Sequence, residues 1–240
     1  KTPFIADSKG ISIEVKNLNF GFEANKTLLE NINFSVSAGQ KVCVMGDGAS
    51  GKSLLLELIG GTLKNFQGVV NVNDIPLNNI NQNEYRKNIG IFYNEQDIFD
   101  GTLYDNICMG NNAITPKEIM DLADILEISD FISHLPEGLY TPLQPTGKGL
   151  STIIAKKILL LRAITNHPEL LILDEPFELA GAESSRKISN YIASLQNTTC
   201  FVASGYVPFA EKCDQIIWLE KGKIKQVGTP QVILPLLNKI

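Results

Sequence analysis

The chain has 240 residues, a formal net charge of -5 and 44% hydrophobic residues. These values are typical of one large globular domain, or of two lobes that share a core, and they exclude disorder as the main state. The apolar stretches fall far short of the ~18–20 residues that cross a bilayer. The sequence also lacks the Lys/Arg-rich blocks of a dedicated nucleic-acid binder. Four scattered cysteines without C-x-x-C spacing favour a reducing compartment.

The first 60 residues combine alternating strands with one strand that is apolar throughout. Residues 11–15 and 32–36 alternate apolar and polar side chains, and residues 19–22 are rich in aromatics, which predicts antiparallel strands. Residues 41–45 are nearly all apolar, as in a strand buried on both faces. A glycine-rich stretch links them to an apolar helix at 53–59. This is a strand, loop and helix unit.

The middle of the chain changes from strands to helices. Short strands are predicted at 69–72 and 89–93, and the pattern is helical from about 100 to 166. Within that stretch Thr115 is a predicted N-cap, because a proline follows at the first helical position and Glu118 follows three residues after the cap.

Strands and helices alternate again from residue 170. Buried strands are predicted at 170–173 and 199–203, with a helix at 182–194 between them and a hairpin that begins at 215–220. Strands that alternate with helices predict a mostly parallel sheet.

These elements define a fold class and a domain organisation. We expect an α/β fold in which a mostly parallel sheet with flanking helices is joined by an antiparallel β subdomain and an inserted helical subdomain. The whole chain, 1–240, would be one domain. Its core lobe would comprise about 11–93 and 167–240, and its helical subdomain about 100–166.

One glycine-rich segment carries a strong motif. It matches G-x-x-x-x-G-K-[ST] and lies between a buried strand and a helix, as the motif requires. Glycines let backbone N–H groups turn toward a polyphosphate, and the helix N-terminus adds a favourable partial charge. Lys52 is expected to reach the terminal phosphates, and Ser53 to bind Mg²⁺. The predicted nucleotide-binding residues of this P-loop NTPase core are Gly46, Asp47, Gly48, Ala49, Ser50, Gly51, Lys52 and Ser53.

Two adjacent carboxylates follow the apolar strand at 170–173. Parallel sheets of this kind bind ligands at the carboxyl ends of their strands. Asp174 is suited to hold hydrated Mg²⁺, and Glu175 is the candidate catalytic base that would orient or deprotonate a water. A solvated strand terminus is the alternative interpretation of the pair.

These motifs and several further segments resemble the nucleotide-binding domain of ATP-binding cassette (ABC) transporters of the exporter type. Residues 99–107 are similar to the exporter segment F-x-G-T-I-x-x-N-I, and residues 135–138 and 147–151 resemble the approach to the family's signature. The resemblance runs from about Ile11 to Leu237, which is nearly the whole chain.

The resemblance implies ATP and Mg²⁺ as cofactors, and it implies two kinds of partner. Members of this family dimerise with a second nucleotide-binding domain, identical or different, and sandwich two ATP molecules. They drive a membrane domain, which here would precede Lys1 or be a separate chain. The domain would then lie as a soluble unit on the cytoplasmic face of a membrane.

The resemblance also implies an aromatic residue that stacks on adenine. The aligned segment is Phe20-Gly-Phe22, so Phe22 is the candidate. A core phenylalanine in a half-buried strand is the competing interpretation.

The signature of the family is altered in this chain. L-S-G-G-Q aligns with L-S-T-I-I, which keeps Ser151 and replaces the two glycines by Thr152 and Ile153. β-Branched residues oppose the close backbone approach to a phosphate that glycines allow. In the alternative interpretation Ser151 only caps a helix whose Ile153, Ile154 and Ile158 pack inward.

Three other family positions are altered. The glutamine that contacts Mg²⁺ aligns with Asn94, which is one methylene shorter, and Gln96 is the competing candidate. The aspartate that follows the carboxylates aligns with Gly181, and the switch histidine aligns with Ser204.

Three hypotheses follow. The first is a Mg·ATP-dependent, dimerising ATPase of an exporter whose altered motifs make it slow. The second is a degenerate cassette that binds ATP in a regulatory or structural role. The third, a soluble P-loop kinase or DNA-repair cassette, is disfavoured by the exporter-like segment at 99–107.

Overall fold

A six-stranded sheet lies at the centre of the molecule. The computed structural model describes residues 2–4, 9–23, 26–93, 95–179 and 181–237. The strand order is β12-β11-β3-β10-β9-β6, and all neighbours are parallel except the β11–β12 hairpin. The strands are β3 (Lys41–Met45), β6 (Ile89–Phe92), β9 (Leu170–Asp174), β10 (Thr199–Ala203), β11 (Gln215–Glu220) and β12 (Lys223–Gly228). The predicted mostly parallel sheet is confirmed.

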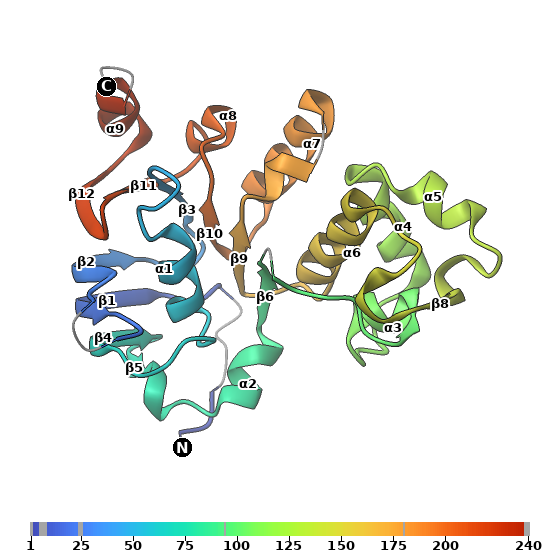
Figure 1. Cartoon of the computed structure of the whole chain (residues 1–240), viewed down its shortest axis with the longest axis horizontal. Helices are drawn as coiled ribbons and strands as arrows, with labels where there is room; N and C mark the ends of the chain where they lie inside the picture. Colours follow the sequence, from blue (N-terminus) through green and yellow to red (C-terminus); the bar gives the residue numbers. More distant parts are fainter. Residues whose placement is uncertain (1, 5–8, 24–25, 94, 180, 238–240) are drawn as a thin grey trace.

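Both faces of this sheet are covered, and β3, β9 and β10 are therefore buried at every position. On one face helix α1 (Lys52–Ile59) shares an apolar core with the second sheet. On the other face a separate core joins α7 (Ala182–Ser194), α8 (Val207–Ala210) and α9 (Pro230–Leu237) to the helical end of the molecule. Figure 1 shows α1 between the two sheets and α7 to α9 beyond β9 to β12.

The second sheet is antiparallel, in the order β2-β1-β4-β5. Its strands are β1 (Ile13–Phe20), β2 (Leu29–Val36), β4 (Gln67–Val72) and β5 (Ile75–Pro76). The two predicted strands at 11–15 and 19–22 are one strand, because irregularities in the register let β1 continue. Asn17 and Asn31 have positive φ there, and their N–H groups donate to the side-chain oxygens of Asn33 and Asn19, both at 2.9 Å.

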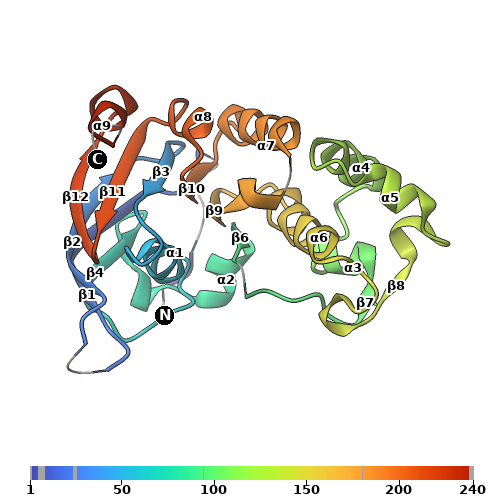
Figure 2. The same cartoon turned by 45° about the horizontal axis from the view of Figure 1, so that its top comes forward.

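The helical part of the chain lies at the end remote from this antiparallel sheet (Figure 2). Thr115 caps its helix in a reciprocal capping box with Glu118, as predicted. The elements of this part are β7 (Gly101–Thr102), α3 (Leu103–Cys108), α4 (Pro116–Ile125), α5 (Ser129–His134), β8 (Pro142–Leu143) and α6 (Thr152–Thr165). Helix α6 packs on β6 and so connects this end to the central sheet.

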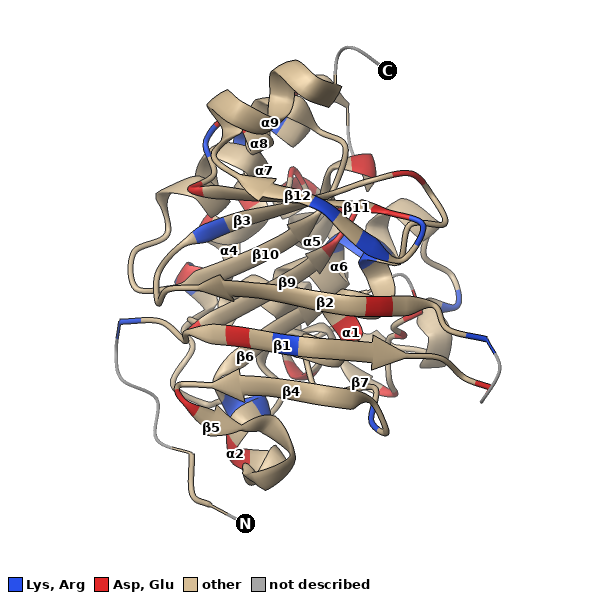
Figure 3. Cartoon of the chain, turned by 90° about the vertical axis from the view of Figure 1, so that its left-hand side faces the viewer, with Lys and Arg blue, Asp and Glu red and all other residues tan. Residues whose placement is uncertain are grey.

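Short helices complete the fold. They are α2 (Gln82–Lys87) and the 3-10 turns η1 (Leu77–Asn79), η2 (Gly138–Tyr140), η3 (Pro145–Gly147) and η4 (Pro176–Leu179). Within the described ranges, every helix is too short or too polar to cross a membrane. Basic and acidic residues are interspersed on the outer strands (Figure 3), where Lys16 pairs with Glu14 at 2.7 Å.

Candidate nucleotide-binding site

The glycine-rich loop leaves the end of β3 and turns directly into α1. A Cβ at Gly46 would lie 2.3 Å from the carbonyl oxygen of Leu219, so only glycine fits there. Gly51 has φ of 98°, and a Cβ on it would lie 2.6 Å from Leu29 Cδ2. Residues 47–49 of the loop are exposed. The backbone of the loop is therefore both fixed in shape and open to a ligand.

The first turn of α1 has the features of an anion site. Gly51 precedes the helix and supplies no side-chain cap, so no side chain competes for the N–H groups of the first turn. The Lys52 amine donates to the carbonyl oxygens of Gly46 and Asp47 at 2.7 and 3.1 Å, which holds its charge inside the loop. The buried Ser50 hydroxyl oxygen has no hydrogen-bond partner among the described residues.

Asp174 lies at the carboxyl end of β9, beside the start of α1. Its side chain is 5% exposed, and burial raises its pKa, while a hydrogen bond with Ser53 and the charge of Lys52 act in the opposite direction. A cavity of about 410 Å³ is lined by Ser53 and Asp174 together with Glu57 and Gln96. A hydroxyl and a carboxylate that meet at the edge of a cavity are hard oxygen ligands, so the residues fit Mg²⁺.

Glu175 follows Asp174 in an unusual backbone conformation, with φ of 50°. Its N–H donates to the carbonyl oxygen of Ala203 at 2.9 Å, which fixes the residue beside the end of β10. Burial raises the pKa of the Glu175 carboxyl, Lys52 lowers it, Glu178 and Asp174 raise it, and a hydrogen bond with Ser204 lowers it. A carboxylate with a raised pKa at a strand end is a candidate proton acceptor.

The two candidates for the glutamine position have different outcomes. Asn94 lies outside the residues that the structure describes. Gln96 lines the cavity beside Asp174, but its amide oxygen accepts the N–H of Tyr93 at 3.1 Å. Gln96 is therefore near the site with one lone pair of its oxygen already in use.

The aromatic pair at the end of β1 is divided between core and surface. Phe20 is 6% exposed, whereas Phe22 is 69% exposed, and their rings meet edge to face at 5.1 Å. The interpretation of Phe22 as a core residue is wrong. The N–H of Leu28 donates to Phe20 O at 2.7 Å, and the neighbouring Leu29 packs on Gly51, so the pair lies next to the phosphate loop.

The altered signature forms the start of α6. Ser151 is the N-cap, and its hydroxyl oxygen accepts the N–H of Ile154 at 3.2 Å, as predicted. Ile158 is fully buried and Ile154 partly so, but Ile153 is 56% exposed. The prediction that Ile153 packs inward is wrong, because its place in the first turn points it away from the core. Ser151, Thr152 and Ile153 do not line the cavity beside Asp174.

The other altered positions lie at the ends of β9 and β10. Ser204 is 2% exposed directly after β10, and the pairing of Ala203 with Asp174 places it beside Glu175. Gly181 is exposed at the start of α7, where it offers no side-chain cap.

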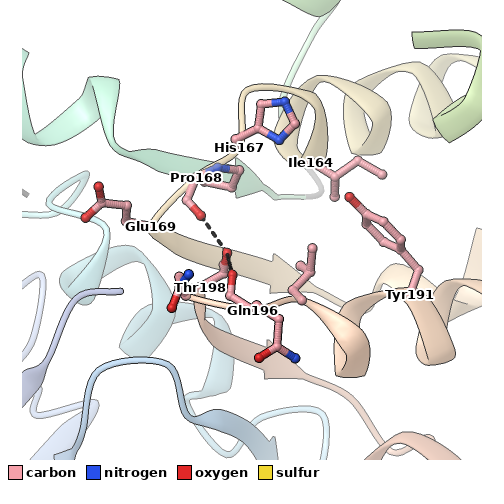
Figure 4. A pocket seen from close by; sticks show the side chains of 9 residues that line it. Ile164, His167, Pro168, Glu169, Tyr191, Gln196 and Thr198 are labelled. Carbon is pink, nitrogen blue, oxygen red and sulfur yellow. Dashed lines mark hydrogen bonds between the residues drawn. The ribbon is translucent and has the colours of Figure 1, made fainter. Parts of the chain in front are cut away.

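A second hollow lies at the opposite ends of these strands (Figure 4). It has a volume of about 270 Å³ and contains His167, Tyr191 and Gln196. The Thr198 hydroxyl donates to the carbonyl oxygen of Pro168 at 2.9 Å across its floor. His167 is 70% exposed with φ of 46°, and it lies 3.4 Å from Glu118. It is an exposed turn residue, as expected, and is remote from the carboxylates.

Two acidic residues near the site were missed at the level of sequence. Glu57 lies four residues after Ser53 on α1, a spacing that places both on one helix face. Burial and the charges of Glu95 and Asp174 raise its pKa. Glu178 lies in η4, and its charge raises the pKa of Asp174 and of Glu175. The helical spacing could have identified Glu57, whereas Glu178 carries no such signal.

A strand, a glycine-rich loop and an uncapped helix define a P-loop nucleotide-binding domain, and the comparisons with known proteins agree. A family model described as "ABC transporter" matches residues 29–178. A "Putative export ATP-binding/permease protein" of Rickettsia bellii is 31% identical over 222 residues, which are 91% of this chain and 38% of that protein. An "ATP-dependent lipid A-core flippase" of Saccharophagus degradans is 29% identical over 223 residues, with 92% and 38% covered.

The chain belongs to the ABC transporter family, as its ATP-binding domain. The fold and the family predicted from the motifs are confirmed, and with them membership of a family of ATPases. A bacterial Atm1-family ABC exporter with ATP bound has the same fold, with a TM-score of 0.86 at 22% identity, over 99% of this chain and 41% of that one. The chain spans well under half the length of these relatives.

Proposed function

We propose that this chain binds Mg·ATP at Gly46–Ser53 and hydrolyses it slowly, in a dimer that drives a membrane domain. The observation that supports the proposal best is the meeting of three groups at one edge of the central sheet: the loop that surrounds Lys52, the Ser53–Asp174 pair, and Glu175. These groups are a phosphate cradle, a set of metal ligands and a proton acceptor.

Each group has one task in the reaction. The N–H groups of the loop and the Lys52 amine hold the phosphates, and Ser53 and Asp174 hold Mg²⁺. When bound there, the ion would supply positive charge that neutralises the phosphates. Glu175 accepts a hydrogen bond from the attacking water and takes its proton, and burial raises the pKa of its carboxyl, which makes it a stronger proton acceptor. Phe22 offers an exposed ring face to adenine.

The dimer partner is a second nucleotide-binding domain, identical or different. Each ATP would contact the loop of one domain and the signature of the other. The first turn of α6 offers exposed Ile153 where a phosphate needs close backbone N–H groups. Ser204 stands in the position of the switch histidine. The chain's own site therefore lacks the histidine, and the partner's site lacks the glycines of the signature. Slow hydrolysis follows.

The membrane domain docks in the groove between the core lobe (about 11–93 and 167–240) and the helical subdomain (about 100–166), on the cytoplasmic face of the membrane. The groove has a volume of about 650 Å³ and includes Arg86 and Lys87 from one side and Met109 from the other. Both cations and Met109 are exposed, which fits a segment that carries acidic and apolar side chains. Charge reversal at Arg86 and Lys87 should uncouple ATPase activity from the membrane domain and leave nucleotide affinity unchanged.

The test is a pair of measurements on wild type and Glu175→Gln. Both should bind Mg·ATP with similar affinity, and Glu175→Gln should release phosphate far more slowly than the wild type. Binding without release in the wild type would favour the regulatory cassette, and no binding would contradict the proposal altogether.

A further inference from the structure

The segments that follow β9 and β10 lie side by side at the nucleotide edge of the sheet. In the parallel register Ala203 is opposite Asp174, so the next residues on the two strands, Ser204 and Glu175, are neighbours. The N–H of Glu175 donates to Ala203 O at 2.9 Å, and the N–H of Ser204 donates to Val44 O at 3.2 Å. Both backbones are thus fixed to adjacent strands.

The Ser204 side chain has one defined hydrogen-bond partner and is buried at the strand end. Its oxygen accepts the N–H of Tyr206 at 3.1 Å, and the side chain is 2% exposed. A hydroxyl has one proton to donate, and in a buried place that proton needs an acceptor. Glu175, at the end of the adjacent strand, is the carboxylate that the β9–β10 register places beside it. Lys52, Glu178 and Asp174 are the charged groups that act on the same carboxyl.

Aromatic contacts lock the two segments together. The ring of Phe177, two residues after Glu175, lies 4.9 Å from the ring of Tyr206 and 5.3 Å from that of Phe209. The Ser185 hydroxyl donates to Phe177 O at 2.9 Å and ties the same turn to α7. Ser204 and Glu175 therefore approach each other as parts of one packed unit.

We propose that Ser204 is a positioning residue, whose hydroxyl donates to Glu175 and holds one carboxylate oxygen in place so that the other faces the attacking water. The proposal rests on the proposed function of Glu175. Ser204 aligns with the family's switch histidine. In this proposal its hydroxyl orients the base, so the replacement of histidine by serine does more than remove a contact to phosphate. Pre-organised orientation of a base is a recognised source of rate enhancement.

The test combines kinetics with a spectroscopic measurement. Ser204→Ala should lower kcat about tenfold, as loss of a hydrogen bond to a charged group would, and change KM for Mg·ATP less than about twofold, because the phosphate loop is intact. In a Glu175→Gln background, single-turnover phosphate release should be nearly the same with and without the Ser204→Ala substitution, because Ser204 acts through the carboxylate. An equal loss in both backgrounds would overturn the proposal in favour of a structural role.

The spectroscopic measurement does not depend on turnover. In the nucleotide-free chain, the ¹³C carboxyl resonance that disappears in Glu175→Gln should move in Ser204→Ala. It should stay in place in Ser189→Ala, a matched loss of a buried hydroxyl on α7. An unmoved resonance would overturn the pairing. If no variant releases phosphate, the proposed function fails, and the carboxyl shift still decides whether Ser204 donates to Glu175.

Discussion

Helices α1 and α6 begin in opposite ways, although the resemblance to ABC exporters implies a phosphate at the start of each. Helix α1 follows Gly51 without a side-chain cap and is wrapped by a loop whose Lys52 is held inside. Helix α6 follows Ser151, whose hydroxyl already accepts an N–H of the first turn, and exposes Ile153.

The difference shows what an anion site at a helix start requires. N–H groups of the first turn attract a phosphate when no side chain satisfies them and no Cβ obstructs the approach. The start of α1 meets both conditions, and the start of α6 meets neither. Under the proposed function, this chain keeps the half-site for its own ATP and has lost the half-site that it would offer to a partner.

The largest expected effect comes from the base that serves the intact half-site. Glu175→Gln should lower kcat about 10²–10⁴-fold, because a positioned base is lost, while Mg·ATP affinity stays close to that of the wild type. Single-turnover phosphate release and nucleotide titration measure the two quantities. A mutant rate within a few-fold of wild type would remove Glu175 from the mechanism.

Glu175→Gln should also change how the stability of the folded chain depends on pH. Burial and the carboxylates nearby raise the pKa of Glu175 in the folded chain, so the folded state holds this proton more tightly than the unfolded state does. The ionised carboxylate then costs stability, increasingly so as the pH rises from the unfolded pKa of ~4.3 through the raised folded value. Without nucleotide, Glu175→Gln should melt at a higher temperature than wild type at pH 7, and the difference should vanish near pH 4. A lower melting temperature at pH 7 would contradict the sign.

The next largest effect is expected from removing the positive charge of Lys52. Lys52→Ala should weaken Mg·ATP binding by at least about 100-fold, because a charge-assisted contact to the phosphates is lost. Isothermal titration of both proteins measures it, with Lys64→Ala, a substitution after the end of α1, as a control for lost positive charge. Equal affinities of wild type and Lys52→Ala would sink the assignment of the loop.

The stacking of Phe22 on adenine is expected to contribute less to nucleotide affinity than Lys52 does. Phe22→Ala should weaken binding by about 1–3 kcal/mol through lost stacking, without lowering the melting temperature, because the ring is 69% exposed. Phe20→Ala should mainly destabilise the fold, since its ring is buried. The reverse pattern in titrations and thermal melts would identify Phe20 as the residue that stacks on adenine.

The smallest expected effect is that of removing the N-cap of α6, and it distinguishes the role of this helix start from that of α1. Ser151→Ala should lower stability by about 0.5–2 kcal/mol, because α6 loses its N-cap, and leave Mg·ATP affinity of the single chain unchanged. Chemical denaturation and titration report the two values. A change in affinity would show that the start of α6 contributes to the chain's own nucleotide site.

Much of the fold was predictable because its elements carry local signals. The strand at 199–203 and the helix at 182–194 match β10 and α7, since continuous apolar runs and helical spacing depend on neighbours in the chain. The glycine-rich motif likewise predicted a loop between a buried strand and a helix, which is the loop between β3 and α1. The exposure of single side chains was harder to predict. The sequence left Phe22 open between core and surface, and the interpretation of the altered signature as a helix cap placed Ile153 in the core, although it is exposed.

The rest depends on contacts between distant parts of the chain. Ser204 meets Glu175 only because β10 and β9 pair in a particular register, which no short window of sequence encodes. From the sequence alone Ser204 was a missing histidine. In the structure it is the neighbour of the proposed base, and the interpretation of that position changes accordingly.

Steady-state phosphate release at saturating Mg·ATP tests the central claim, an intact binding half-site joined to an impaired catalytic centre. Typical enzymes turn over at about 10 per second, and each missing transition-state contact costs about 10²–10³-fold. We therefore expect nucleotide binding together with a rate of about 0.1 per second or lower. Turnover at tens per second by the unaltered chain would contradict the account.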